Sequence, residues 1–224
     1  MIYVRQRGSW DCGLACVEMT LSYLGLPCES DLRDTFPTKS VWTIDLCLLL
    51  KRQGIKKLTF CTTCVGVNPS HSGLSYYSSL ENDRARVQRA FEEAPLAGVK
   101  IVDTAAPLDY IISRLKEKAS LFIVLVDVNL LVCTNADEVR GGVGGDGSTD
   151  PEGGQRASLK ATSSYRGHYI LLCDYDSTTQ RVKYMDPQYG SCKGGCEMDC
   201  GVLECARTAS GTDNDLIEII NAQR

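Results

Sequence analysis

The stretch QRGSWDCGLA, residues 6–15, constrains the fold more than any other part of the sequence. Cys12 opens an amphipathic run in which apolar residues recur every three or four positions. Asp11 is a favourable N-cap and Gly25 a favourable terminator, so the spacing predicts a helix over about 12–24. The thiol of Cys12 would then lie at the positive end of the helix dipole, which stabilises a thiolate.

A thiolate needs a base, and the chain has only two histidines. His71 lies in a polar stretch without periodicity, which is typical of a loop. His168 opens the apolar run HYILLCDYD, which predicts a buried strand whose first residues face a cleft. A second strand, RVKYM, follows the turn STTQ and ends at Asp186, before Pro187. A hairpin of these two strands would bring the imidazole of His168 and the carboxylate of Asp186 to one end of a sheet.

Two other carboxylates compete with Asp186 as the partner of the imidazole. Asp174 and Asp176 follow His168 in the same predicted strand. Because a strand rises about 3.3 Å per residue, a position six residues away lies about 20 Å off. The sequence therefore favours Asp186.

These motifs resemble known families. Gln6, the segment DCGLAC, the Gly-His pair at a strand start and the later Asp-Pro pair resemble the papain-like cysteine peptidases, above all those that process bacteriocin leaders. The combination of SWDCGLAC, SVWTIDLCLLL, YRGHYILLCDYD and RTASGTDNDLIEI is similar to the eukaryotic guanylyl cyclase domain-containing protein family, over nearly the whole chain. The first resemblance implies an α+β, papain-like fold, in which an N-terminal helix bearing the cysteine packs on a mostly antiparallel sheet bearing His and Asp. The second implies a guanylyl cyclase activity.

The papain-like resemblance implies a cysteine hydrolase that acts on a peptide or isopeptide bond of a peptide or protein substrate. Cys12 would be the nucleophile and His168 its base, and Asp186 would orient the imidazole. The Gln6 side-chain amide and the Cys12 backbone N–H would stabilise the oxyanion, each by about 3–4 kcal/mol. This chemistry needs no cofactor.

Each of these four residues also has a structural interpretation. Cys12 is then a core cysteine, His168 a satisfied buried histidine, Asp186 a turn residue and Gln6 an exposed side chain. A second class of function is the cyclase, with GTP as substrate and Mg²⁺ or Mn²⁺ as cofactor. The sequence offers it no paired carboxylates at metal spacing and no cationic phosphate cradle. A third class is a non-catalytic module that binds a peptide in the same cleft.

Length and composition suit a single domain over residues 1–224, since 43% hydrophobic content is enough to form a core. A net charge of −4 without a basic block predicts neither a nucleic-acid nor a membrane partner. No apolar run reaches the roughly 18 residues of a membrane helix, and the start of the chain lacks the apolar core of a signal peptide. We therefore expect a cytoplasmic protein, with the nucleus as an additional location.

The twelve cysteines are expected to be reduced thiols. Cys47, Cys133 and Cys173 lie in apolar runs and are typical of core packing. The cluster Cys192–Cys205 includes the run CEMDCGVLECARTA, which predicts a helix with Cys196 and Cys200 on one face. The usual pair of two-residue gaps of a zinc site is absent, so the pattern favours packing or redox sensitivity over a metal.

The remaining elements are predicted from periodicity and caps. The run SVWTIDLCLLLKRQG predicts a second helix capped by Thr43, with Trp42 in the core. The run LENDRARVQRAFEEA predicts a solvated helix between strands in KKLTFCTT and GVKIVD, an order that allows a crossover, and the run SLFIVLVDV predicts a central strand.

Residues 134–164 include seven glycines within RGGVGGDGSTDPEGGQ and predict a mobile loop insertion, with a lid over the cleft as the alternative. A phosphate-binding loop is not indicated, because no Gly-Lys-Ser/Thr ending follows the glycines.

Overall fold

The computed structural model describes residues 2–28, 30–74, 80–131, 164–188 and 195–220. The predicted loop insertion 134–164, apart from its last residue, and the cysteines at 133 and 192 lie outside the described residues. The helices are α1 (Cys12–Tyr23), α2 (Thr43–Arg52), α3 (Leu80–Leu96), α4 (Leu108–Lys116) and α5 (Cys200–Arg207), with short 3₁₀ turns η1 (Leu32–Thr35), η2 (Pro69–Gly73) and η4 (Val128–Leu130). The strands are β1 (Leu58–Thr62), β2 (Lys100–Asp103), β3 (Ser120–Asp127), β4 (Gly167–Asp176), β5 (Arg181–Met185), β6 (Cys196–Asp199) and β7 (Leu216–Ile220).

The strands form one seven-stranded sheet in the order β2-β1-β7-β3-β4-β5-β6. The crossover through α3 makes β1 and β2 parallel, as predicted, and the other neighbouring pairs are antiparallel. The predicted α+β class and mostly antiparallel sheet are confirmed. The predicted central strand, β3, is the middle strand of the sheet.

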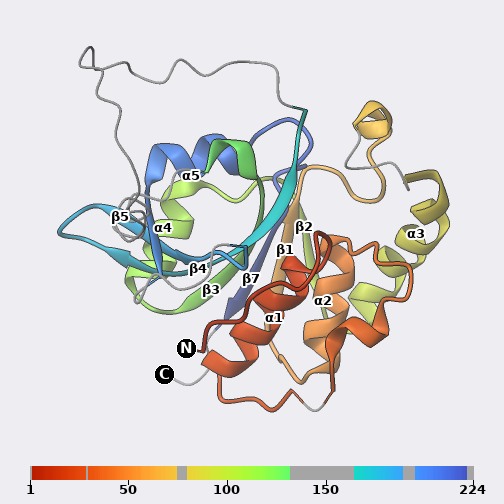
Figure 1. Ribbon diagram of the computed structural model, residues 1–224, viewed down its shortest axis with the longest axis horizontal. Helices are drawn as coiled ribbons and strands as arrows, with labels where there is room; N and C mark the ends of the chain where they lie inside the picture. Colours follow the sequence, from red (N-terminus) through yellow and green to blue (C-terminus); the bar gives the residue numbers. More distant parts are fainter. Residues whose placement is uncertain (1, 29, 75–79, 132–163, 189–194, 221–224) are drawn as a thin grey trace, which may run out of the picture.

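Helices cover both faces of the sheet (Figure 1): α1, α2 and α3 lie on one side, and α4 and α5 on the other. Successive residues of a strand point to opposite faces, so a strand buried on both sides is apolar throughout. In β3, Leu121, Ile123 and Leu125 pack toward the first group of helices, while Phe122 and Val124 pack toward the second. Helix α3, predicted as a solvated helix, also has a buried face. Its buried residues belong to the core on the same side of the sheet as α1 and α2: Val87, Ala90, Phe91 and Ala94.

Of the two predicted helix caps, the position of Asp11 is confirmed and that of Thr43 is wrong. Asp11 occupies the N-cap position of α1, but its side chain makes no capping hydrogen bond, because it accepts hydrogen bonds from the preceding loop instead. Thr43 is the first residue inside α2, and the N-cap is Trp42, whose backbone N–H donates to Asp45 at 2.9 Å. Thr43 lines a cavity described below, where its hydroxyl donates a hydrogen bond to Asp215.

The predicted helix over CEMDCGVLECARTA is also wrong in its first part. Residues 196–199 form strand β6, which pairs with β5 through Cys196 and Tyr184. Asp199 then caps α5 by accepting a hydrogen bond from the backbone N–H of Gly201 at 2.7 Å. Cys196 and Cys200 therefore do not share a helix face. Among the residues whose positions are described, no group of three His, Cys, Asp or Glu side chains could hold a metal ion.

Strand β7 was not predicted, although it lies between β1 and β3 in the sheet. Its segment LIEII carries Glu218 in the middle of an apolar run, and that side chain is buried. Of the predicted core cysteines, Cys47 is buried in α2 and Cys173 is partly buried in β4. None of the helices in the described ranges combines the length and the apolar character needed to cross a membrane.

Candidate functional site

Cys12 is the first residue of α1 and is buried, with 5% of its surface exposed. The helix packs closely on β4, where the thiol of Cys16 donates to the backbone oxygen of Tyr169. A Cβ atom on Gly13 would lie 2.7 Å from the side chain of Leu46 and 3.1 Å from that of Tyr169, so a larger residue next to the cysteine would force these side chains to shift. The motif DCG thus lets the start of α1 approach both α2 and the sheet.

His168 and Asp186 lie at the same end of the sheet, as predicted. His168 is the second residue of β4, and Asp186 follows the last residue of β5. Nε2 of His168 lies 2.8 Å from Oδ1 of Asp186, and both side chains are buried. The carboxylate also accepts a hydrogen bond from the backbone N–H of Gln188 at 2.8 Å, which fixes its orientation.

The electrostatic environment favours a protonated His168. Burial lowers the pKa of this imidazole, but hydrogen bonds with the Asp186 carboxylate and with the Cys12 side chain raise it, and the net result is a pKa of about 9. Because Nε2 is engaged by Asp186, Nδ1 is the ring nitrogen left for the sulfur. The structure therefore places Cys12 near the buried pair of His168 and Asp186, although the three residues lie far apart in the sequence.

Gln6 lies beside these residues, in the loop before α1. Its backbone N–H donates to the carbonyl of Pro187 at 3.0 Å, which ties the loop to the segment after Asp186. Nε2 of its side chain donates to the carbonyl of Gly8 at 2.7 Å. Oε1 is buried and has no hydrogen-bond partner among the residues described. Its role as an oxyanion donor stays a prediction.

Asp11 holds this loop in place, a role that cap chemistry did not suggest. Its fully buried carboxylate accepts hydrogen bonds from the backbone N–H groups of Arg7, at 3.0 Å, and Gly8, at 2.8 Å. Arg33 reaches it from η1 with Nε at 2.5 Å. Burial opposes ionisation, but the two backbone hydrogen bonds and Arg33 lower the pKa of Asp11 below its ordinary value.

Two cavities lie next to these residues, and Ser9 lines both. The first has a volume of about 350 Å³ and includes Cys12 in its wall. The second has a volume of about 450 Å³ and includes Gln6 and His168. Cys12 and His168 therefore line different cavities, which have Ser9 in common.

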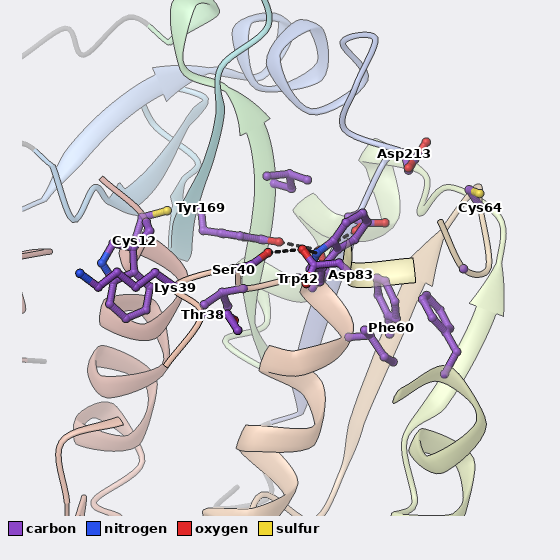
Figure 2. A pocket seen from close by; sticks show the side chains of 18 of the residues that line it. Cys12, Thr38, Lys39, Ser40, Trp42, Phe60, Cys64, Asp83, Tyr169 and Asp213 are labelled. Carbon is purple, nitrogen blue, oxygen red and sulfur yellow. Dashed lines mark hydrogen bonds between the residues drawn. The ribbon is translucent and has the colours of Figure 1, made fainter. Parts of the chain in front are cut away.

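The first cavity runs from Cys12 toward Asp213 and Cys64 (Figure 2). Trp42, predicted as a core residue, packs only partly on the core and also lines this cavity, where its Nε1 donates to Asp83 at 3.2 Å. No local sequence pattern predicts this cavity, because its walls come from seven separate parts of the chain.

His71, predicted as a loop residue, lies in a short 3₁₀ turn and is buried. It lies in η2 with 5% of its surface exposed, and its Nε2 lies 3.4 Å from Oδ1 of Asp213. Asn68 donates to the same oxygen at 2.6 Å. The pair was missed because Asp213 comes from the far end of the chain.

Comparison with known proteins agrees with the predicted family. A family model described as guanylylate cyclase matches residues 1–219. Guanylyl cyclase 1 of Arabidopsis thaliana is 33% identical over 220 residues, which cover 97% of this chain and 74% of that protein. These names favour the cyclase alternative over the peptidase interpretation, and they do not test the roles predicted for the individual residues. By the match along nearly its full length, the chain belongs to the guanylylate cyclase family.

Proposed function

We propose that the protein is a thiol-dependent hydrolase with a papain-like core, acting on a peptide or isopeptide bond. The observation that carries the proposal is the buried pair of His168 and Asp186, 2.8 Å apart, with Cys12 close enough to raise the pKa of the same imidazole. A histidine held protonated at neutral pH beside a cysteine at a helix N-terminus favours a thiolate–imidazolium pair.

In this mechanism the sulfur of Cys12 attacks the carbonyl carbon and forms a tetrahedral oxyanion. The backbone N–H of Cys12 and the Gln6 side chain are the donors proposed for that oxygen. One N–H of the Gln6 amide is used by Gly8, which leaves the second for the oxyanion. His168 passes its proton to the leaving amine as the carbon–nitrogen bond breaks, and water then hydrolyses the thioester. No metal or cofactor takes part.

Alkylation kinetics test the activated cysteine directly. We expect iodoacetamide at pH 6 to label Cys12 faster than the exposed Cys28 and Cys205, with peptide mass spectrometry as the readout. His168→Gln should remove the advantage of Cys12, whereas Cys28→Ser should leave it unchanged. If Cys12 is labelled no faster than the exposed thiols, the hydrolase proposal is wrong, and a non-catalytic peptide-binding cleft becomes the better account.

Guanylyl cyclase activity is the second candidate, supported by the family and by the name of the Arabidopsis relative. One feature of the site also favours it. The cavity of about 450 Å³ beside His168 is lined by Arg5, Arg7 and Arg166, a concentration of positive charge that the sequence analysis did not find. Guanidinium groups are suited to phosphate oxygens. The guanidinium of Arg7 is paired with Asp31, so Arg5 and Arg166 are the better candidates for phosphate contacts.

The two candidates are separated by assaying cyclic GMP formation from GTP with Mg²⁺ or Mn²⁺ by mass spectrometry. A cyclase that uses the arginine cavity should lose activity in Arg5→Gln and Arg166→Gln and should keep it in Cys12→Ala. Cyclic GMP formation that depends on the two arginines and not on Cys12 would show that the cyclase activity does not use the thiol. Absence of the product with both metals, together with selective alkylation of Cys12, would favour the hydrolase.

A further inference from the structure

The cavity of about 350 Å³ next to Cys12 has walls of two kinds. Five aromatic side chains contribute to it: Trp10, Trp42, Phe60, Phe91 and Tyr169. Three carboxylates, Asp83, Asp213 and Asp215, lie among them. Aromatic faces next to carboxylates are suited to an alkyl chain that ends in a positive charge.

The three carboxylates differ in how completely they are satisfied. Asp83 pairs with Arg86 at 3.0 Å and accepts hydrogen bonds from Ser40 and Trp42. Asp213 accepts a hydrogen bond from Asn68 and faces His71. These two are therefore already balanced by groups of the protein.

Asp215 differs from them because no charged group of opposite sign pairs with it among the described residues. Its Oδ2 accepts a hydrogen bond from the hydroxyl of Thr43, which lies 2.8 Å from the hydroxyl of Tyr169. The other group that stabilises its charge is the hydroxyl of Thr62, so both of its partners are neutral. The one lysine on the wall, Lys39, is exposed, and no salt bridge links it to Asp215 within the part of the chain that the structure describes.

We infer that this cavity is a subsite for a lysine or arginine side chain of the substrate, whose positive end pairs with the carboxylate of Asp215. The inference deepens the proposed hydrolase function and rests on it for the position of the scissile bond at Cys12. The aromatic walls would enclose the alkyl part of the side chain. The cavity volume lies at the lower end of the range of about 300–1,000 Å³ that is typical of ligand pockets.

The protonation of Asp215 bears on this assignment. Burial raises the pKa of Asp215 to about 8, and hydrogen bonds from Thr43 and Thr62 only partly oppose the increase. Without a counter-charge the carboxyl of Asp215 therefore favours its protonated form at neutral pH, and a cation bound beside it would favour the ionised form. The other titratable or charged groups close to it are Asp213, Cys64, Cys47, Lys39, Asp83 and Tyr169.

The chain carries its own reporter for binding, since its two tryptophans, Trp10 and Trp42, both line this cavity. We expect n-butylammonium to cause a saturable change in tryptophan fluorescence, with an affinity at least tenfold higher than that of n-butanol. Asp215→Asn, which removes the charge and keeps the shape, should abolish this preference. Asp109→Asn, on the exposed side of α4, is the matched control and should preserve it.

Binding assays test the cation subsite, and hydrolysis assays test the proposed hydrolase activity on which it rests. With paired peptides that differ only in lysine against norleucine, we expect at least a tenfold higher kcat/KM for lysine, lost in Asp215→Asn. Saturable binding of n-butylammonium without hydrolysis would keep the subsite and reject the hydrolase. Equal affinity for n-butylammonium and n-butanol in the wild-type protein would overturn the subsite, whether or not Asp215→Asn folds.

Discussion

Nε of Arg33 lies 2.5 Å from Oδ2 of Asp11, and both side chains are shielded from solvent, with 9% and 0% of their surface exposed. The same guanidinium contacts Glu18 of α1 at 2.7 Å. The carboxylate of Asp11 also accepts hydrogen bonds from the backbone N–H groups of Arg7 and Gly8, which lie in the loop that carries Gln6. The start of α1, the turn η1 and the loop beside the candidate site are thus held by one buried charge cluster.

Removing the arginine from this cluster should be costly. Arg33→Met leaves the buried carboxylate of Asp11 without its counter-charge, so we expect a loss of about 3–5 kcal/mol in the free energy of unfolding. Arg7→Met is the matched control, because Arg7 also pairs with an aspartate but has 67% of its side chain exposed. It should cost less than about 1 kcal/mol. Urea unfolding at pH 7 measures both, and equal effects would contradict the structural role of Arg33.

The pH dependence of stability should report on Asp11. Since folding lowers the pKa of this carboxyl, its ionisation stabilises the protein above the ordinary pKa, and the contribution is lost as the pH falls through the lowered value. Asp11→Asn should therefore be less stable than the wild type at pH 7, and the gap should narrow toward pH 3. The measurement is urea unfolding at several pH values. A gap that stays constant would mean that shape, not charge, is what the position requires.

The titration of His168 should follow its contacts. Its pKa of about 9 means that the imidazolium is present at neutral pH and is lost as the pH rises through about 9. In Asp186→Asn the carboxylate that raises this pKa is gone while burial still lowers it, so the midpoint should move well down toward or below 6.5. NMR titration of the imidazole signals measures it, and His71→Gln assigns them because the chain has only two histidines. An unchanged midpoint would show that Asp186 does not control the proton.

The raised pKa has a consequence for stability with a defined sign. A histidine that binds its proton more tightly when folded stabilises the protein fully below its ordinary pKa of about 6.5, and this contribution disappears as the pH rises through about 9. In the proposed hydrolase, activity should fall over the same alkaline range. Asp186→Asn should shift that fall to lower pH, in step with the NMR midpoint.

Gln6 provides a test of oxyanion stabilisation. If its amide donates to the developing oxyanion, Gln6→Ala should lower kcat by about 10²- to 10³-fold with little change in KM. Gln53→Ala, at the end of α2, should leave both constants unchanged. Peptide hydrolysis at fixed pH measures the effect. A change confined to KM would assign Gln6 to substrate binding and leave the oxyanion to backbone donors.

Local chemistry explains which elements were predictable. The helix at Cys12, the hairpin that carries His168 and Asp186, and the crossover through α3 each have a clear period and a recognisable turn, and each is present. The predicted contact of His168 with Asp186 is present because a tight hairpin fixes which residues meet across it. Their catalytic roles stay predictions.

Long-range contacts explain what was not predictable. Aspartate is a common N-cap residue, but the carboxylate of Asp11 binds Arg33 and the backbone N–H of Gly8 instead of the backbone N–H groups of α1. His71 and Asp213 meet only in the folded chain. The segment from Cys196 to Asp199 has a helical pattern, yet an open edge of β5 was available to pair with it. Tertiary hydrogen bonds outweighed the local propensity in each of these cases.

Strand β7 was missed because Glu218 interrupts its apolar pattern, and that residue allows a last prediction. Its buried carboxylate accepts hydrogen bonds from Tyr110 at 2.9 Å, Arg114 at 3.0 Å and Ser120 at 2.6 Å, and it thereby joins α4 to the sheet. Glu218→Gln should lower the free energy of unfolding by about 2–3 kcal/mol, because it weakens charge-assisted hydrogen bonds in a buried site.

Glu117→Gln is the matched control, since this residue lies 3.7 Å from the same arginine but has 59% of its side chain exposed. It should change the stability by less than about 1 kcal/mol. Urea unfolding measures both, and Cys12 alkylation without urea should proceed at the wild-type rate in each variant, because Glu218 contacts α4 and the sheet on the face opposite α1. A slower alkylation in Glu218→Gln alone would show that this cluster also sets the geometry of the candidate site across the sheet.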